Sequence, residues 1–544
     1  MNRAVAALAG LRAALRNDNV RRVELAWGAA IAAEWAHFVA LGVFAYDAGG
    51  TAAVGVAGLA RMLPAAIVAP LASTLGDRFR RERVLLGTAA VAAAALGASA
   101  LVFFTVRSEA LIFVLAAVIG VASTLFRPAL QAILPSLART PGELIAANGA
   151  SSTIESLGTL AGPLLAGVLV SAGDPGVVFA AAACVLAAGT LALATLQVEG
   201  VIQERAALED VRELVLGGFE AVRKGPARLI LVLMAIQGFV RGCLNVLIVV
   251  AVFRVLDEGD GAVGYLTAAL GLGGLVGAFG AMTLRSRRLA AALGGALIFW
   301  GLPIALFAPR PYLPAMVLLL AVVGAANSVE DVAGFTLLQR TVPDAALSRA
   351  LGLLWGAVMG AVALGSITAP LAVAALGPRA AFAVVGGILP TVTLLVWQQL
   401  RRIDRELAPP TAELELVAEV PLFEPLSLGA KEHLAGKLTH VHVEPGEVVV
   451  QAGETGDRFY IVGEGELEIT NGTRGSAHGG DFFGEIALLR DVPRTATVRA
   501  VLSSELYALE RDDFLAAVTH SSVRAAGEAV AEERLAAGLT AAAR

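Results

Sequence analysis

The 544-residue chain is 57% hydrophobic and only 16% charged, with a mean hydropathy of +0.75, which lies outside the range of soluble proteins. Residues 1–400 hold 27 basic and 22 acidic side chains (net +5), whereas residues 401–544 hold 14 basic and 24 acidic ones (net −10). A wholly soluble enzyme is therefore excluded. The sequence predicts a membrane-embedded body followed by a soluble acidic domain.

Twelve stretches are apolar and long enough to cross a membrane, since a spanning helix needs about 20 such residues. They are residues 23–46, 51–72, 84–105, 109–135, 146–171, 176–197, 228–254, 261–284, 289–308, 313–338, 347–374 and 378–400. The predicted fold class is an all-α membrane bundle of 12 transmembrane helices. The first run is longer than a secretory signal and leads into further spans, so no cleaved signal peptide is expected.

The connections between the spans differ in charge. Arginines gather before the first span (Arg12, Arg16, Arg21, Arg22), after the second (Arg78, Arg80, Arg81, Arg83), after the eighth (Arg285, Arg287, Arg288) and after the last (Arg401, Arg402, Arg405). The connections at 47–50, 171–176 and 257–261 contain no arginine or lysine. The positive-inside rule then places both termini in the cytoplasm of a multi-pass cell-membrane protein.

The two halves of the membrane body repeat each other. Gly120-Val-Ala-Ser in the fourth span matches Gly324-Ala-Ala-Asn in the tenth, a shift of 204 residues. At a shift of 207, Gly149, Gly158 and Gly162-Pro163 match Gly356, Gly365 and Ala369-Pro370. Two six-helix halves, about 1–197 and 228–405, joined by a cytoplasmic loop at 198–227, are typical of a transporter whose substrate passes between the halves.

The fifth span carries a motif that resembles the major facilitator superfamily of secondary transporters. Gly149, Gly158, Gly162, Pro163 and Gly167 follow its antiporter pattern G-x8-G-x3-G-P-x2-G-G, except that Ala166 replaces the first closing glycine. Small residues allow close helix packing, and the proline introduces a bend. The resemblance implies an exporter that works by alternating access, although ordinary small-residue packing would produce a similar pattern.

A second signature of this family lies between the second and third spans. The family has G-x3-D-R-x-G-R-R, and this chain has Ser73-x3-Asp77-Arg78-Phe79-Arg80-Arg81, without either glycine. The resemblance implies that Asp77 and Arg78 take part in gating the cytoplasmic side.

Several ionisable side chains lie inside predicted spans, where each costs about 2.5–3.5 kcal/mol on insertion scales. They are Glu34, His37 and Arg61, Glu155, Arg241 with the polar Gln237 and Asn245, and Glu330 with Asp331. Either a carboxylate carries a proton between two conformations, or static Glu–Arg pairs hold helices together. Glu34 is the first candidate proton carrier, because His37 and Arg61 are placed to adjust its proton affinity, and Glu330 and Asp331 come next. Proton coupling itself is implied by the family resemblance.

The sequence indicates neither an enzyme nor a metal-binding protein. The spans contain few aromatic and hydrogen-bonding side chains to line a path, which favours a small apolar or amphipathic substrate over a sugar. The two cysteines, Cys184 and Cys243, lie in apolar runs and form neither a disulfide framework nor a metal site. No nucleophile–base set or metal cluster is recognised in the tail, and no catalytic cofactor or nucleic acid is expected.

The pattern changes after the last span. Residues 406–417, with Pro409-Pro410, predict a stiff linker. From about residue 418, short apolar runs at 448–450, 459–462 and 467–469 alternate with glycine turns, which predicts a small β-roll, and helices follow from Asp512 and from Ser522. The tail, 418–544, is therefore predicted to be a cytoplasmic α+β domain.

The string from Phe483 to Leu489, followed by Pro493 to Val498, resembles the phosphate-binding cassette of cyclic nucleotide-binding domains, F-G-E-[IL]-A-L then P-R-x-A-T. It implies cAMP or cGMP as a regulatory ligand, with a site of Phe483, Gly484, Glu485, Ile486, Ala487, Leu488, Arg494, Thr495 and Ala496. Gly484 lets the backbone and a helix N-terminus approach the phosphate, Arg494 pairs with it, and Glu485 accepts the ribose hydroxyl. Alternatively, Glu485 and Arg494 form a surface salt bridge. Thr495 suits a guanine contact or a phosphate contact, and cAMP is the default.

The loop between the halves contains an apolar stripe on a charged background, formed by Leu208, Val211, Val215, Phe219 and Val222. This predicts an amphipathic helix that either lies on the membrane surface or docks on the tail. Together, these features predict a cyclic nucleotide-regulated, proton-coupled exporter, either monomeric or homodimeric. The alternatives are a membrane-anchored cyclic nucleotide receptor and a lipid or lysolipid translocator.

Overall fold

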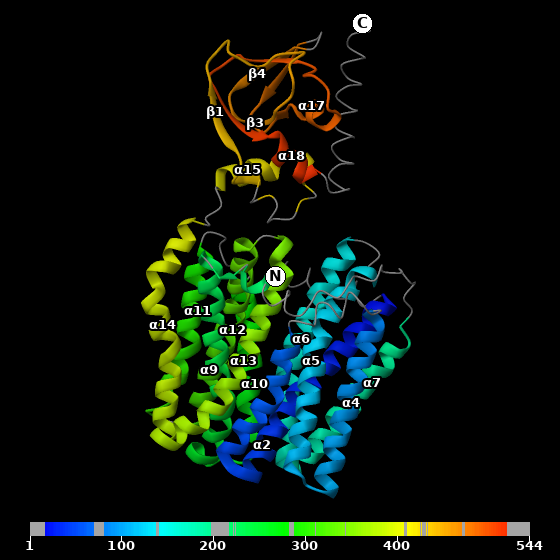
Figure 1. Cartoon of the computed structure of the whole chain (residues 1–544), viewed down its shortest axis with the longest axis vertical. Coiled ribbons are helices and arrows are strands. Elements are labelled where there is room, and N and C mark those ends of the chain that lie inside the picture. Colours follow the sequence, from blue (N-terminus) through cyan, green and yellow to red (C-terminus); the bar gives the residue numbers. More distant parts are fainter. Residues whose placement is uncertain are drawn as a thin grey trace. The chain divides into compact units, whose positions relative to one another are not determined.

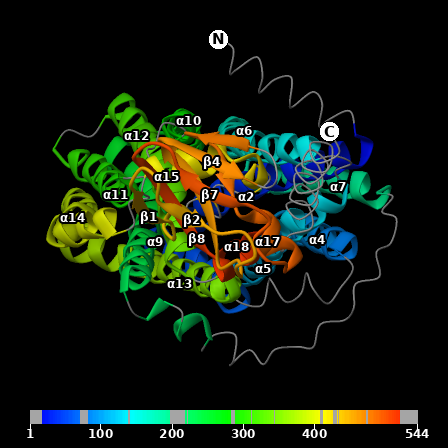
Figure 2. The same ribbon diagram turned by 90° about the horizontal axis from the view of Figure 1, so that it is seen from above.

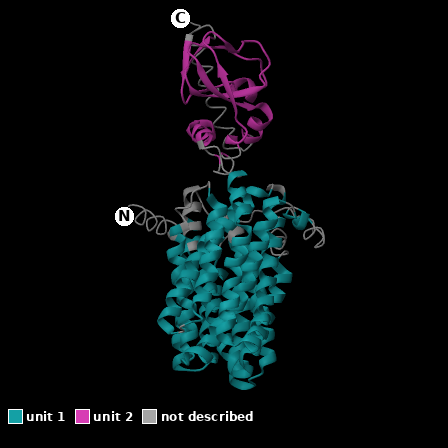
Figure 3. Cartoon of the chain, turned by 90° about the vertical axis from the view of Figure 1, so that its left-hand side faces the viewer, with its two compact units in different colours: residues 1–406 teal, residues 407–544 magenta. Residues whose placement is uncertain are grey.

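The computed structural model describes residues 17–69, 81–137, 141–196, 217–220, 222–223, 225–281, 288–309, 312–342, 344–406, 411–424, 426, 431, 434–470 and 474–518. Asp77 and Arg78, most of the loop 198–227, Pro409-Pro410 and the segment from Ser522 lie outside these residues. The chain divides into two compact units, residues 1–406 and 407–544 (Figure 3).

The first unit is a bundle of long apolar helices. They are α2 (Asp18–Val68), α4 (Arg81–Thr105), α5 (Glu109–Leu137), α6 (Pro141–Ala172), α7 (Pro175–Ala194), α9 (Gly225–Ala251) continued by the π-helical turn η2 (Val252–Leu256), α10 (Gly261–Ala281), α11 (Leu289–Leu306), α12 (Leu313–Thr341), α13 (Asp344–Leu376) and α14 (Pro378–Glu406). Eleven helices in the described part of the chain are long and apolar enough to span a membrane.

Helix α2 contains two crossings. Its 51 residues would extend about 77 Å at 1.5 Å per residue, whereas the hydrocarbon core of a bilayer is about 30 Å thick. Gly49 and Gly50 interrupt the helical dihedrals, and Gly50 has a φ of 63°, which glycine adopts without strain. Among the described residues, the bundle therefore contains twelve helical stretches that are long enough to cross a membrane, the number that the sequence predicts.

The crossings form two halves that lie side by side, α2 to α7 and α9 to α14 (Figures 1 and 2). Equivalent helices pack in equivalent ways. A methyl group at Gly158 of α6 would lie 2.7 Å from Ile31 on α2, and one at Gly365 of α13 would lie 2.0 Å from the carbonyl oxygen of Phe239 on α9. The two glycines are related by the 207-residue shift, so the repeat in the sequence is also a repeat in the packing.

The second unit is a β-roll with short helices. Its strands are β1 (Thr439–Val443), β2 (Val448–Val450), β3 (Arg458–Glu464), β4 (Glu466–Thr470), β5 (Arg474–His478), β6 (Phe482–Phe483), β7 (Thr497–Ala500) and β8 (Ser504–Glu510), and its helical segments include α15 (Thr411–Glu419), η4 (Pro421–Phe423), α17 (Glu485–Arg490) and α18 (Arg511–Val518). Two antiparallel four-stranded sheets run in the orders β1-β8-β3-β6 and β2-β7-β4-β5.

The inner faces of the roll hold its core. Side chains of β3, β4, β7 and β8 form it, and Val462, Leu467 and Leu506 are completely buried there. On the other face of β3, Phe459 and Ile461 are buried in a second cluster with Phe423 and Phe514. The predicted fold class, a helical membrane bundle with an α+β tail, is confirmed.

Candidate functional sites

The two halves touch near the end of the bundle that holds the Gly49–Gly50 turn. The rings of Tyr46 and Phe253 stack with centroids 4.4 Å apart. A methyl group at Gly42 would lie 3.2 Å from Val249. These contacts join α2 to α9 and η2.

Two further contacts between the halves lie on either side of the α2–α9 contact, and in both a glycine of one half meets a proline of the other. A methyl group at Gly55 of α2 would lie 2.7 Å from the ring of Pro370 on α13, and one at Gly264 of α10 would lie 2.4 Å from the carbonyl oxygen of Pro163 on α6. Farther along α2 and α13, a methyl group at Gly360 would lie 3.9 Å from Ala66, which is ordinary van der Waals separation. Between α6 and α10 the close packing continues to mid-helix, where a methyl group at Gly271 would lie 2.8 Å from the carbonyl oxygen of Thr159. The halves are therefore packed closely from the Gly49–Gly50 end to the middle of the bundle, and less closely between Gly360 and Ala66.

Glu34 and Arg61, both predicted as transport residues, form an ion pair. Nη2 of Arg61 lies 2.6 Å from Oε1 of Glu34, and the two side chains are 6% and 28% exposed. The guanidinium also lies 5.7 Å from the ring centroid of Phe38. Arg61 is thus the buried partner, and Glu34 is the member of the pair that remains accessible.

His37 makes no hydrogen bond to this pair, although it interacts electrostatically with Arg61. It is fully buried, its ring centroid is 5.6 Å from that of Phe179 on α7, and neither ring nitrogen has a hydrogen-bond partner. His37 therefore makes no hydrogen bond to Glu34. His37 lies three residues after Glu34 on the same helix, and its side chain points into the packed interior of the first half.

An ion pair between α5 and α6 includes a residue that the sequence analysis missed. Nη2 of Arg127 lies 3.1 Å from Oε2 of Glu155, and both side chains are partly exposed. Arg127 lies within the predicted span 109–135, so the general rule for ionisable residues in membranes would have identified it. On α2, Glu24 is a further ionisable residue within the predicted span 23–46. It is fully buried and accepts a hydrogen bond from the hydroxyl of Ser151.

The second half holds a hydrogen-bonded polar cluster. Oδ1 of Asn327 accepts bonds from Nε2 of Gln237 (3.3 Å) and Nε1 of Trp300 (3.2 Å), and its Nδ2 donates to Oδ2 of Asp331 (2.9 Å). Glu330 is fully buried beside it, and both carboxylates interact electrostatically with Arg241. The predicted residues of α9 and α12 therefore form one group.

A small cavity of about 20 Å³ adjoins Glu34 inside the first half. Apart from Glu34, the lining residues with a polar group are Trp27, Thr88 and Ser123, and the others are apolar. A cavity of this size has room for about one water molecule. A water there would have hydrogen-bonding partners on three different helices.

In the tail, the cassette connects β6 to β7. Gly484, with a φ of 93°, turns the chain from β6 into α17, and a side chain at this position would be strained. Glu485, Ala487 and Leu488 of α17 are buried, whereas Thr495 is exposed in the loop that follows. Phe483 stacks on Tyr460 of β3 at a centroid distance of 5.0 Å.

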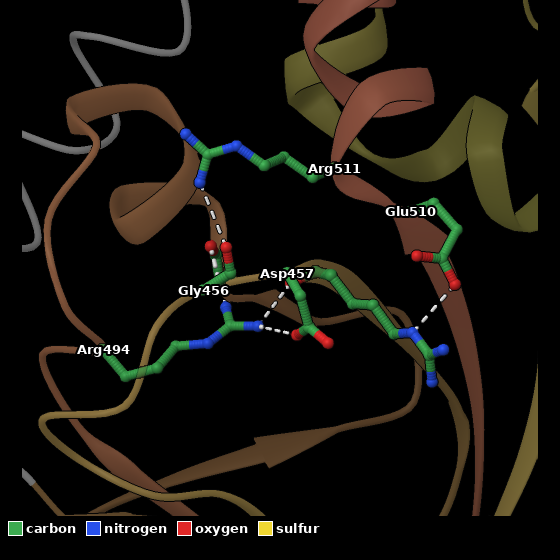
Figure 4. Close-up of polar contacts among 7 residues, drawn as sticks. Gly456, Asp457, Arg494, Glu510 and Arg511 are labelled. Carbon is green, nitrogen blue, oxygen red and sulfur yellow. Dashed lines mark hydrogen bonds and ion pairs between the residues drawn. The ribbon is translucent and has the colours of Figure 1, made fainter.

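Arg494 is anchored by the protein on several sides (Figure 4). Its Nη1 donates to the carbonyl oxygen of Gly484 (3.2 Å), and its Nη2 donates to that of Arg458 (2.8 Å) and to Oδ1 of Asp457 (3.3 Å). The side chain is 4% exposed. Since Glu485 is also buried, an exposed surface salt bridge does not describe these two residues.

A second arginine holds the same turn. Nη1 of Arg511, at the start of α18, donates to the carbonyl oxygen of Gly456 (3.1 Å), and its Nη2 donates to Oδ1 of Asp491 (2.6 Å). Its backbone N–H donates to the carbonyl oxygen of Asp457 (2.8 Å). Figure 4 shows Arg494 and Arg511 reaching this turn from different elements. These contacts were not anticipated, because the residues lie 20 to 55 positions apart.

Two kinds of hydrogen-bond donor lie at the turn between β6 and α17. A guanidinium and the backbone N–H groups after Gly484 lie together, and both are donors that suit a phosphate. Burial raises the pKa of the Tyr460 hydroxyl, so this ring stays neutral where it lies 6.0 Å from the Arg494 guanidinium carbon.

The family model of the Major Facilitator Superfamily matches residues 25–310, and that of the cyclic nucleotide-binding domain matches residues 440–521. The chain is 43% identical over 100 residues to a cAMP-dependent protein kinase regulatory subunit of Yarrowia lipolytica, a match that covers 18% of this chain and 27% of that protein. It is 35% identical over 133 residues to the cyclic nucleotide-gated potassium channel mll3241 of Mesorhizobium japonicum, covering 24% of this chain and 35% of that protein. The chain thus spans about a quarter to a third of the length of these relatives.

Two solved transporter structures resemble the chain in fold. The nucleoside transporter NupG has a TM-score of 0.61 at 14% identity, covering 70% of this chain and 99% of that one. A POT family transporter has a TM-score of 0.59 at 13% identity, covering 71% and 96%. At such low identity these likenesses concern the fold alone.

Proposed function

This chain belongs to the Major Facilitator Superfamily and carries a cyclic nucleotide-binding domain, and from that premise we propose that it is a proton-coupled exporter of a small apolar or amphipathic molecule, regulated by cAMP or cGMP. The observation that carries the proposal is the Glu34–Arg61 ion pair inside a bundle whose halves pack closely from the Gly49–Gly50 end to the middle. A static bundle has no need of an accessible carboxylate at this depth.

The predicted orientation in the membrane decides which side of the bundle is closed. With both termini in the cytoplasm, the Gly49–Gly50 turn lies on the outer side of the membrane, and the described state is closed outward. Alternating access requires a second state that is closed at the opposite end. The Asp77–Arg78 signature, which lies outside the described residues, belongs to that opposite end in the proposed orientation.

Glu34 is the proposed proton carrier. Its carboxylate is paired with Arg61 at 2.6 Å yet remains 28% exposed, so a proton can reach it. A proton on Glu34 abolishes the charge of the carboxylate and so weakens its pairing with Arg61. For export driven by an inward proton gradient, Glu34 takes up this proton from the outer side in the state that is open outward. The proton leaves the same oxygen toward the cytoplasm in the described state, where the ionised carboxylate pairs with Arg61. Glu330 and Asp331, in the polar cluster of the other half, are the second candidates.

The proposal is tested by flux in proteoliposomes. A panel of labelled amphipathic compounds is loaded, a pH gradient is imposed, and wild-type protein is compared with Glu34→Gln. The amide occupies the same volume but cannot carry a proton, so gradient-driven flux should be lost while the protein remains monodisperse. Glu109→Gln, at the exposed start of α5, is the matched control and should retain flux. Unchanged pH-driven flux in Glu34→Gln would assign the proton to Glu330 or Asp331.

The tail is proposed to bind cAMP or cGMP, with cAMP as the default. Arg494 and the N–H groups after Gly484 hold the phosphate, and Glu485 accepts the ribose hydroxyl. The named relatives include a cAMP-dependent regulatory subunit and a cyclic nucleotide-gated channel, which supports a regulatory rather than a catalytic ligand.

Regulation is tested by measuring flux with and without saturating nucleotide, in the full chain and in a chain ending before Pro409. A typical coupling of about 1–3 kcal/mol corresponds to a change of several-fold rather than complete switching. Equal flux in all four conditions would show that the tail does not control transport. Nucleotide binding without transport of any compound would instead favour a membrane-anchored receptor, and flux of labelled lysolipid would favour a lipid translocator.

A further inference from the structure

The contacts between α2 and α9 mark the axis that relates the two halves. Gly42 and Val249 are 207 residues apart, and so are Tyr46 and Phe253. Each pair is in contact, the glycine against Val249 and the two rings stacked at 4.4 Å. Residues at equivalent positions of a repeat touch each other only where they lie beside the pseudo-twofold axis. The axis therefore passes between these two helices.

The same line of residues continues away from the contact. Four-residue steps from Tyr46 and Gly42 lead to Phe38 and then to Glu34, and these positions share one face of a helix. All four are half-buried, whereas His37, Val39 to Leu41 and Val43 to Ala45 are buried, so this face is the less tightly packed one.

The partner helix continues in the same way. From Phe253 and Val249, four-residue steps lead to Asn245 and then to Arg241, and these last two are half-buried among buried neighbours. Arg241 is the 207-residue equivalent of Glu34. A carboxylate and a guanidinium thus occupy equivalent positions on the two faces that meet at the axis.

A second pair of equivalent positions shows the same reversal of sign. Arg127 on α5 and Asp331 on α12 are related by the 204-residue shift, and the two interact electrostatically. Like charges at such positions would repel when the halves close, whereas opposite charges attract. Opposite charges at equivalent positions of the two halves, found here twice, are what an ion pair between the halves requires.

In the described state, Glu34 and Arg127 form their ion pairs within the first half, while Asp331 also interacts electrostatically with Arg127 across the halves. Glu34 pairs with Arg61 at 2.6 Å, and Arg127 pairs with Glu155 at 3.1 Å. Arg241 interacts with Glu330 and Asp331. Glu34 is therefore paired with Arg61 rather than with Arg241 in this state.

We propose that Glu34 exchanges Arg61 for Arg241 when the halves close at the end opposite the Gly49–Gly50 turn, and that this cross-half ion pair stabilises the closed state. The inference rests on the proposed alternating access, but not on the identity of the substrate or on proton coupling. Arg61 stabilises the state described here, and Arg241 stabilises the other one. The two arginines therefore act on the conformational equilibrium in opposite directions.

The experiment measures this equilibrium directly. Spin labels are placed at Thr153→Cys on α6 and Gln339→Cys on α12, two exposed positions toward the end opposite the turn, in a chain with Cys184 and Cys243 replaced by alanine. Double electron–electron resonance in lipid nanodiscs then gives the populations of long and short distances, without substrate or gradient.

Arg241→Gln should lower the ratio of short to long distances about fivefold or more, and Arg61→Gln should raise it by a comparable factor, as typical coupling strengths predict. Arg379→Gln, at the exposed start of α14, is the control and should leave the ratio unchanged. Shifts of the same sign in both variants, or no shift in Arg241→Gln, would overturn the exchange. Size-exclusion profiles identify a variant that fails to fold. Arg241→Lys keeps the positive charge, so it should retain most of the wild-type ratio of short to long distances and replaces Arg241→Gln as the test if the latter does not fold.

The outcome is separable from that of the proposed function. A chain that transports none of the test compounds can still show opposite shifts in the two variants. Conversely, intact pH-driven flux with unshifted distances would retain the exporter and reject the exchange.

Discussion

Replacing Arg494 should abolish most nucleotide binding, and the structure indicates why the effect should be large. The side chain is 4% exposed, and its guanidinium is held by two carbonyl oxygens and by Oδ1 of Asp457. It is therefore already oriented before a phosphate arrives, and little side-chain entropy is lost on binding. Arg494→Ala removes a desolvated charge together with its orientation.

The size of the loss follows from the class of interaction. Truncating one partner of a buried, hydrogen-bonded charge pair costs about 2–5 kcal/mol. Because part of the phosphate charge also meets backbone N–H groups, we expect about 2–4 kcal/mol, or about 30- to 700-fold in Kd. Arg494→Lys keeps the charge but loses the planar fork, so its affinity should fall between those of Arg494→Ala and the wild type.

Titration calorimetry of the full chain in detergent micelles, with cAMP and then with cGMP, measures these affinities. Arg499→Ala removes an exposed arginine from β7, close in sequence to the cassette, and should bind as the wild type does. Equal Kd values for Arg494→Ala and Arg499→Ala would refute the assignment of the phosphate to Arg494. Absence of binding by the unaltered chain would refute the nucleotide site altogether.

Three further outcomes are expected. Thr495→Ala should weaken cGMP binding by about 1 kcal/mol, the worth of one hydrogen bond, and leave cAMP binding unchanged, whereas equal losses for both nucleotides in calorimetry would place the hydroxyl on the phosphate. The hydrogen bond to Glu505 and its charge raise the pKa of His442 above its usual value of 6.5. The His442–Glu505 contact therefore stabilises the tail fully below about pH 6.5, and this stabilisation is lost as the pH rises through the raised pKa. The melting temperature of the tail should fall from pH 6 to pH 8, and Glu505→Gln should reduce this fall; an equal fall in that variant would contradict the assignment. Gly365→Ala should destabilise the bundle by about 1–3 kcal/mol through overpacking, and Gly387→Ala, which has open space around it, should not; equal melting temperatures would contradict the close packing at Gly365.

Periodicity and composition predicted the architecture well because both depend on local sequence. Apolar length alone identified twelve crossings, even though the two in α2 are joined only through Gly49 and Gly50. The 207-residue repeat predicted that Gly158 and Gly365 would occupy equivalent positions, and both pack against the first helix of their own half. The glycine-separated apolar runs of the tail became β2, β3 and β4.

The contacts of the sites depended on the tertiary structure. Asp457 and Arg511 meet only because the start of β3 lies beside the end of β8, and their sequence neighbourhood carries no sign of it. His37 was expected to adjust the proton affinity of Glu34, and this stays a prediction. The sequence did not indicate that His37 would be buried without a hydrogen bond to Glu34, because burial depends on the packing of α2 against α7. Arg127 is different, since its signal was visible as a charge inside an apolar span.

The glycine–proline contacts at Gly55 and Gly264 have a mechanical consequence. They lie on either side of the axis, join equivalent helices and bring backbone atoms together with little intervening side chain. A rigid-body rotation of one half about a line through both contacts would leave each of them in place, because points on a rotation axis do not move. The same rotation would separate Tyr46 from Phe253 only if the line passes away from the ring stack. Displacement would then grow with distance from this line and be greatest at the far end of the bundle. A bulky residue at Gly55 or Gly264 would therefore restrict the rotation of the whole half, although these positions themselves move least.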